Sequence, residues 1–127
     1  MGRLVPDEVN LRGMSPLTLA FVGDGVYELM VRERLACAAN RPAGALHKAA
    51  VALVRAEAQA EAAERLMPLL SETETAVFRR GRNAHTARNS EEYHKATGLE
   101  ALFGYLYLAG EMERLRSLFA VITGDTE

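Results

Sequence analysis

The stretch LAFVGDGVYELMV, residues 19–31, is apolar at nearly every position, yet it carries an aspartate between two glycines. Ser15 and Pro16 precede it as an N-cap and a first helical residue. From Leu17 to about Ala38 the apolar residues cover nearly every side of a helical wheel. A helix that is apolar all round is a buried helix. We therefore expect this segment to form the central helix of the fold.

Helical periodicity continues beyond this segment, and we expect further helices over residues 45–67, 71–80, 90–109 and 111–122. Ser71, with Glu74 three residues later, is a capping box that marks the start of one of them. Gly81 is placed to end that helix in the left-handed conformation, and Gly110 is placed to break the next one. No segment alternates polar and apolar residues as a strand does. The sequence therefore predicts an all-α fold.

Length and composition are typical of one globular domain. The chain has 127 residues, of which 49% are hydrophobic and 25% charged, so a core can form without a disulfide or a structural metal. We divide it into an N-terminal arm over residues 1–14 and one domain over residues 15–127. Cys37, the only cysteine, is expected to be a small buried hydrophobe. The sequence shows no signal-peptide pattern and no run of about 20 apolar residues, which predicts a cytoplasmic protein without a membrane segment.

The informative residues are carboxylates inside the two most apolar segments. Asp24 lies between Gly23 and Gly25, and each glycine within a helix costs about 1 kcal/mol relative to alanine. Glu100 lies in a second apolar segment, TGLEALFGYLYL, residues 97–108. A buried carboxylate needs a partner. Either an arginine or backbone donors satisfy each acid in the core, or both acids meet in one cleft as hard oxygen ligands of Mg²⁺.

A basic segment, RRGRNAH, residues 79–85, spans the end of the predicted capping-box helix. Guanidinium groups match phosphate geometry, and Asn and His add neutral hydrogen bonds. The same pattern also suits a solvated helix end, where cations favour the helix dipole. The pair His47 and Lys48 is a weaker candidate and suits a plain surface pair. The formal net charge of −2 does not decide whether nucleic acid binds, because binding depends on local basic surface.

Together these segments resemble the ribonuclease III family. Residues 19–31 are similar to the signature helix of that family, residues 97–108 to its second acidic helix, and LHKAAVALVRAEAQA, residues 46–60, to the helix between them. GDGVYE, RGRNA and the short chain resemble more specifically the compact mini-ribonuclease III subfamily, which lacks a separate double-stranded-RNA-binding domain. The resemblance covers roughly residues 15–122 and implies a ribonuclease III-like helical endonuclease domain.

The resemblance implies a magnesium-dependent endoribonuclease that cuts both strands of double-stranded RNA and leaves 5′-phosphates, with Mn²⁺ as a substitute for Mg²⁺. It further implies a homodimer that acts on the precursor of large-subunit ribosomal RNA, with a ribosomal protein as a potential helper. Asp24 and Glu100 match the two central catalytic metal ligands, and Glu28 is expected to orient a water on the metal. The residues expected to bind RNA are Lys48, Arg79, Arg80, Arg82, Asn83 and His85.

Two departures from the wider family concern its other acids. Ala20 stands where ribonuclease III has a glutamate, and Thr97 stands where it has an aspartate; the compact subfamily shares both changes. The number of metal ligands is therefore open. The alternative function, which the loss of these acids favours, is a non-catalytic helical RNA-binding or assembly protein that uses the same basic segment.

Overall fold

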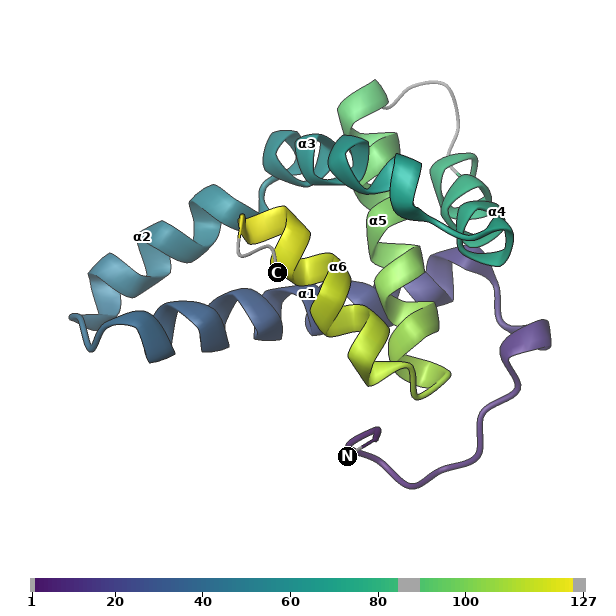
Figure 1. Ribbon diagram of the computed structural model, residues 1–127, viewed down its shortest axis with the longest axis horizontal. Helices are drawn as coiled ribbons and strands as arrows, with labels where there is room; N and C mark the ends of the chain where they lie inside the picture. The colour runs from purple at the N-terminus through teal and green to yellow at the C-terminus, as the bar shows by residue number, and fades with distance from the viewer. Residues whose placement is uncertain (1, 85–89, 125–127) are drawn as a thin grey trace.

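The computed structural model describes residues 2–84 and 90–124, and its described part contains helices and no strand (Figure 1). The helices are α1 (Pro16–Ala38), α2 (Ala43–Val54), α3 (Ala56–Leu66), α4 (Glu72–Arg82), α5 (Glu91–Leu108) and α6 (Met112–Thr123), with short 3-10 turns at Leu11–Gly13 and Met67–Leu69. The all-α prediction is confirmed. None of the helices in the described part of the chain is long and apolar enough to cross a membrane.

Helix α5 is the centre of the fold, because α1, α3, α4 and α6 all pack against it (Figure 1). Its residues Leu99, Leu102 and Phe103 are completely buried. Tyr27 of α1 packs edge-on against the Phe103 ring, with ring centroids 5.2 Å apart. The N-terminal half of α1 packs in this core, and its C-terminal half runs out beside α2 to one end of the molecule (Figure 1).

Helices α1 and α5 touch through their backbones. A Cβ atom on Gly23 would lie 1.6 Å from the Glu100 carbonyl oxygen, and one on Gly104 would lie 2.0 Å from the Leu19 carbonyl oxygen. Neither position can hold a side chain without moving a helix. The two glycines therefore set the distance between α1 and α5, and with it the spacing of the residues beside them.

Gly81 does not end its helix in the left-handed conformation, so that prediction was wrong. It lies inside α4, where an added Cβ would come within 2.6 Å of the Ala101 Cβ and 3.1 Å of the Gly98 Cα. Its role is close packing of α4 on α5. The prediction for Gly110 is confirmed, because this residue has φ +79° directly after α5.

The single helix expected over residues 45–67 is two helices, so that prediction was also wrong. Arg55 is extended, with φ −68° and ψ 160°, and it separates α2 from α3. The break lets α2 follow α1 outward while α3 packs on α5. Alanine-rich composition gives high helix propensity but carries no information about a change of direction that tertiary packing imposes.

The exposure of Cys37 corrects a further expectation, since the side chain was predicted to be buried. It lies near the C-terminal end of α1, which extends beyond the core.

Residues 2–10, in the predicted N-terminal arm, run without a regular element alongside the helices. The Leu4 backbone N–H donates to the Tyr107 hydroxyl at 2.5 Å.

Candidate functional site

The backbone contact between α1 and α5 brings two acids together. Asp24 directly follows Gly23 on α1, and Gly23 touches the carbonyl of Glu100 on α5. The Asp24 and Glu100 side chains are within hydrogen-bonding distance of each other, although 75 residues separate them in the sequence. The spacing of the helices therefore holds two carboxyl groups side by side, as the second of the two predicted arrangements requires.

The electrostatics of the pair favour a bound cation. The pKa of Glu100 is raised to about 7, first by burial and then by the negative charge of Asp24 and a hydrogen bond with it, while a hydrogen bond from Gln59 lowers it. No arginine in the described part of the chain contributes to this shift. The first predicted arrangement, in which an arginine neutralises Glu100, is therefore not what the structure shows. Two carboxyl groups that repel each other share either a proton or a positive ion.

Gln59 is the third polar side chain at this site. It lies on the inner face of α3 and is 2% exposed. Its Nε2 donates to the Val54 carbonyl oxygen at 2.9 Å, across the break between α2 and α3. Its Oε1 is buried and accepts no hydrogen bond from the described residues. An unsatisfied buried acceptor costs about 1–3 kcal/mol, so the site holds an oxygen in need of a partner.

The donor set fits a hard divalent cation such as Mg²⁺. It consists of two carboxylates, the ligand type that Mg²⁺ and Mn²⁺ prefer, and the Gln59 amide hydrogen-bonds to one of them. Among the described residues no group of three or more His, Cys, Asp or Glu side chains gathers at one point. Mg²⁺ keeps several waters and is usually bound through one or two carboxylates. Ala20 and Thr97 are both buried, and the Thr97 hydroxyl donates to the Tyr93 carbonyl oxygen within α5.

Glu28 lies one helical turn after Asp24 and forms an ion pair at the surface. The Arg32 guanidinium donates to its Oε2 from Nε at 2.9 Å and from Nη2 at 2.6 Å. This pairing of residues four apart is ordinary helix-surface chemistry. The expected role of Glu28 in orienting a water on the metal stays a prediction.

The predicted RNA-binding residues come from two separate elements. Arg79, Arg80 and Arg82 are exposed in the last turn of α4, and Asn83 caps that helix. The pKa of Lys95 is raised, chiefly by its hydrogen bond to Glu64, and Arg82 opposes that shift, which places Arg82 near the start of α5.

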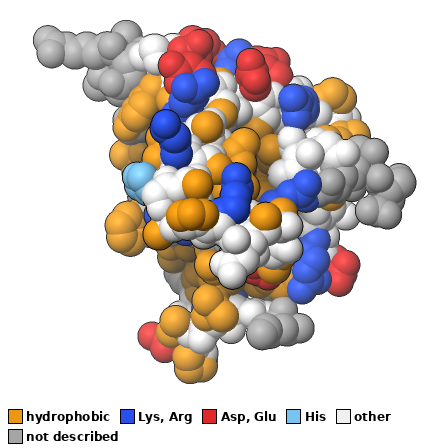
Figure 2. All heavy atoms as spheres, turned by 90° about the vertical axis from the view of Figure 1, so that its left-hand side faces the viewer, with side chains coloured by type: hydrophobic (Ala, Val, Ile, Leu, Met, Phe, Trp, Pro, Cys, Tyr) orange, Lys and Arg blue, Asp and Glu red, His pale blue; other side chains and the backbone are white. Residues whose placement is uncertain are grey.

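Lys48 is exposed on α2, and α2 and α4 lie on opposite sides of the molecule in Figure 1. On the end of the molecule that includes α2, Lys and Arg side chains lie between hydrophobic ones (Figure 2). His85 lies outside the described residues. The described part of the chain therefore presents these basic residues in two separate regions rather than in one continuous patch.

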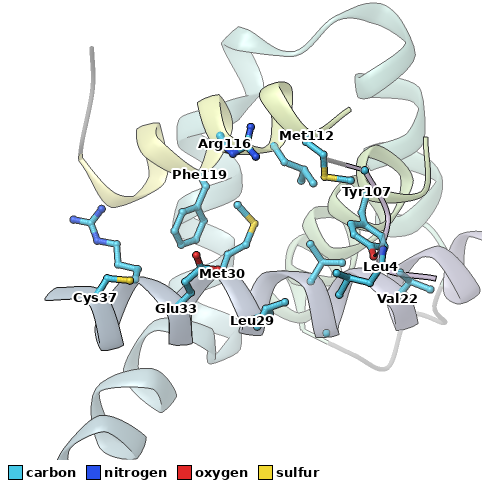
Figure 3. Close-up of a pocket in the computed structure, with 15 residues that line it drawn as sticks. Leu4, Val22, Leu29, Met30, Glu33, Cys37, Tyr107, Met112, Arg116 and Phe119 are labelled. Carbon is cyan, nitrogen blue, oxygen red and sulfur yellow. Dashed lines mark hydrogen bonds between the residues drawn. The ribbon is translucent and has the colours of Figure 1, made fainter. Parts of the chain in front are cut away.

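An apolar groove of about 830 Å³ runs between α1, α6 and the N-terminal arm. Met30 of α1 and Phe119 of α6 point toward one another across it (Figure 3).

The outer side of α1 also carries exposed apolar residues. Phe21 of α1 is 80% exposed, an unusual state for a large apolar side chain. Leu17 and Leu29, at 44% and 52%, lie on either side of it along α1. The outer side of α1 is therefore an exposed apolar surface.

The sequence analysis did not single out Gln59 or Phe21. Gln59 is the only glutamine in the chain and stands between alanines in a segment that otherwise alternates small and charged residues. That isolation was the available signal. Phe21 belongs to the apolar residues that surround the helical wheel of residues 17–38, and the helical pattern does not separate a core face from a face that another molecule covers.

The chain is similar to known proteins in sequence and in fold. The family model described as "Ribonuclease III domain" matches residues 17–111. A protein named "Mini-ribonuclease 3" from Thermoanaerobacter sp. is 50% identical over 110 residues, which are 83% of this chain and 78% of the relative. One of the same name from Symbiobacterium thermophilum is 51% identical, covering 80% and 82%. A crystal structure of a Fusobacterium nucleatum protein superposes with a TM-score of 0.80 at 31% identity, covering 91% of this chain and 97% of that one.

Proposed function

The chain belongs to the mini-ribonuclease III branch of the ribonuclease III family and is an endoribonuclease; from this premise we propose that it hydrolyses double-stranded RNA with Mg²⁺ held by Asp24 and Glu100. The observation that carries the proposal is the contact between these two carboxyl groups at the crossing of α1 and α5. We further propose that the natural substrate is a precursor of large-subunit ribosomal RNA, processed in the cytoplasm with a ribosomal protein as a potential helper.

The bound ion would lower the pKa of a water of hydration and neutralise charge that develops on the scissile phosphate. Asp24 and Glu100 would hold the ion at the protein surface, where a phosphate group could reach it. Asp24 is the exposed member of the pair, and Glu100 is the more buried one. The protein's own contribution is to fix both carboxylates on rigid helices. Hydrolysis of this type leaves a 5′-phosphate and a 3′-hydroxyl.

The exposed basic side chains of α4 and α2 support binding of the RNA backbone. Arg79, Arg80 and Arg82 have no carboxylate partner among the described residues, so their guanidinium groups are available to phosphates. Asn83 and His85 would reach sugars or phosphates nearby, and Lys48 would contact a more distant part of the duplex. Side chains cannot read bases in the deep groove of A-form RNA, so these contacts set the register of the duplex.

The exposed surface of α1 supports a homodimer. A second copy that packs around the same helix would cover Phe21, Leu17 and Leu29 together with the adjacent groove. A two-fold contact of this kind is self-complementary and places two metal sites on one assembly. Two sites related by a two-fold axis match the two antiparallel strands of a duplex.

The decisive experiment uses Asp24→Asn. We expect this variant to lose more than about 10³-fold in cleavage rate, because it removes a ligand charge, while it keeps its fold and its affinity for RNA. A long double-stranded RNA is incubated with each protein, with Mg²⁺ and with a chelator, and the products are separated on a gel. Glu113→Gln, at a carboxylate whose side chain is 94% exposed on α6, is the matched control and keeps full activity.

Cleavage by purified Asp24→Asn would refute the assignment of the metal site. If the parent protein binds the duplex in a salt-dependent manner but leaves it intact with Mg²⁺, the alternative holds and the protein is a non-catalytic RNA-binding or assembly factor.

A further inference from the structure

The two groups next to the Gln59 side chain both accept hydrogen bonds, which favours an amide at this position. On one side it faces the Val54 carbonyl oxygen, which requires a donor, and its Nε2 supplies one at 2.9 Å. It also hydrogen-bonds to the Glu100 carboxyl group. A glutamate here would set a negative charge against a carbonyl oxygen and a carboxylate, and a leucine would donate to neither. These contacts account for the NH₂ group of the side chain but leave its oxygen without a partner.

We propose that Gln59 is a positioning residue of the cation site, whose amide fixes the Glu100 carboxylate and whose Oε1 is a third oxygen acceptor toward the hydrated ion. The inference rests on the proposed function. It assigns to α3 a part in a site that the two acids of α1 and α5 would otherwise form alone.

The chemistry of the three groups identifies a hydrated cation as the shared partner. Asp24, Glu100 and the free Gln59 oxygen are all acceptors when the acids are ionised, so they cannot satisfy one another. A hydrated divalent cation presents positive charge to the carboxylates and water protons to the amide oxygen. An anion would be repelled by the two carboxylates. Outer partners of this kind typically change metal affinity by about 10–100-fold when they are removed.

The test measures Mn²⁺ binding without RNA, from the electron paramagnetic resonance signal of the free ion at pH 8. We expect Gln59→Leu to bind Mn²⁺ about 10–100-fold more weakly than the parent protein. Gln59→Glu restores an oxygen acceptor and is expected to bind at least as tightly as the parent, although it lowers the melting temperature without a metal ion. Gln59→Met, an unbranched side chain without oxygen, replaces the leucine variant if that variant does not fold.

Glu74→Gln is the control for a loss of stability alone. Glu74 is a buried carboxylate bound to Arg114 and to Ser71, away from the acid pair. Its replacement is expected to lower the melting temperature and to leave Mn²⁺ affinity unchanged. A second readout is the Mg²⁺ concentration for half-maximal cleavage, which rises in Gln59→Leu while the rate at saturating Mg²⁺ recovers.

Equal Mn²⁺ affinity of Gln59→Leu and the parent would overturn the inference and leave Gln59 as a cap on the end of α2. Failure of Gln59→Glu to bind more tightly than Gln59→Leu would overturn the acceptor assignment in the same way. Absence of Mn²⁺ binding by the parent protein is a different result, because it refutes the proposed function itself.

Discussion

The carboxyl group of Glu100 titrates near neutral pH. Burial and the neighbouring Asp24 raise its pKa to about 7, so near physiological pH a proton and a cation compete for the same oxygens. Without a metal ion, the folded protein binds this proton more tightly than the unfolded chain does. The contribution of Glu100 to the stability of the metal-free protein is therefore fully present below the ordinary glutamate pKa and is lost as the pH rises through about 7.

The same shift predicts how cleavage depends on pH. At sub-saturating Mg²⁺ we expect the rate to rise with pH up to about 7 and then to level, because ionised Glu100 binds the ion. At saturating Mg²⁺ the midpoint moves to lower pH, since the ion displaces the proton. Initial rates between pH 5.5 and 8.5 at two Mg²⁺ concentrations measure this. If the pH midpoint is the same at both Mg²⁺ concentrations, protons and Mg²⁺ do not compete at Glu100.

The sequence predicted some of the residues of the candidate site. Asp24 and Glu100 were recognisable because a carboxylate inside an apolar helix needs a reason to be there. Gln59 was not, since an amide in an alanine-rich helix has the same pattern whether it faces solvent or the core. Only the fold shows that it is buried and that its oxygen is unpaired.

The crossing of helices α1 and α5 positions the two acids of the candidate site. The two glycines that flank Asp24 are equivalent in the sequence but not in the structure. A Cβ on Gly23 meets the Glu100 carbonyl oxygen at 1.6 Å, whereas a Cβ on Gly25 meets nothing within 4 Å. One glycine is required by the packing of the helices, and the other is not.

We therefore expect opposite effects from the same substitution at these two positions. Gly23→Ala should cost more than about 4 kcal/mol of stability or prevent folding, because the clash is with backbone. Gly25→Ala should stabilise the protein by roughly 0.5–1 kcal/mol, because alanine is the better helix former. Thermal unfolding followed by circular dichroism measures both. Equal damage from the two variants would contradict the close crossing.

The sequence predicted where helices begin, but it did not predict where the chain changes direction between helices. Ser15, Ser71 and Ser90 each accept a hydrogen bond from a backbone N–H in the first turn, as local capping rules predict. The break at Arg55 and the place of Gly81 inside α4 depend on contacts with α5, which lies far away in the sequence. Local propensity cannot report such contacts.

In the molecule as a whole, the exposed apolar side of α1 is a surface that no other part of the described chain covers. The sequence predicted that this helix would be apolar on two sides, and one of them carries Phe21 at 80% exposure. The groove beside it continues the same surface. Burial of apolar area drives association of proteins, so we attribute this surface to a second copy of the chain.

Phe21→Asp tests this assignment by placing a charge in the middle of the contact. We expect the variant to keep its helical content and to become a monomer, as measured by sedimentation equilibrium, and to cut duplex RNA at least tenfold more slowly. Leu69→Asp, at a leucine that is 47% exposed in the turn after α3, is the matched control and remains a dimer. A monomeric parent protein, or an unaltered dimer of Phe21→Asp, would refute the interface.

The backbone contact of α1 and α5 at Gly23 and Gly104 affects which substitutions this enzyme can accumulate during evolution. Where two main chains touch, no rotamer can lengthen or shorten the gap, so the separation of the Asp24 and Glu100 carboxylates does not depend on which apolar side chains fill the surrounding interior. Substitutions there would make the molecule melt earlier or later without moving its reactive centre. Mutational drift can thus adjust thermal tolerance to a new habitat while the chemistry keeps its geometry.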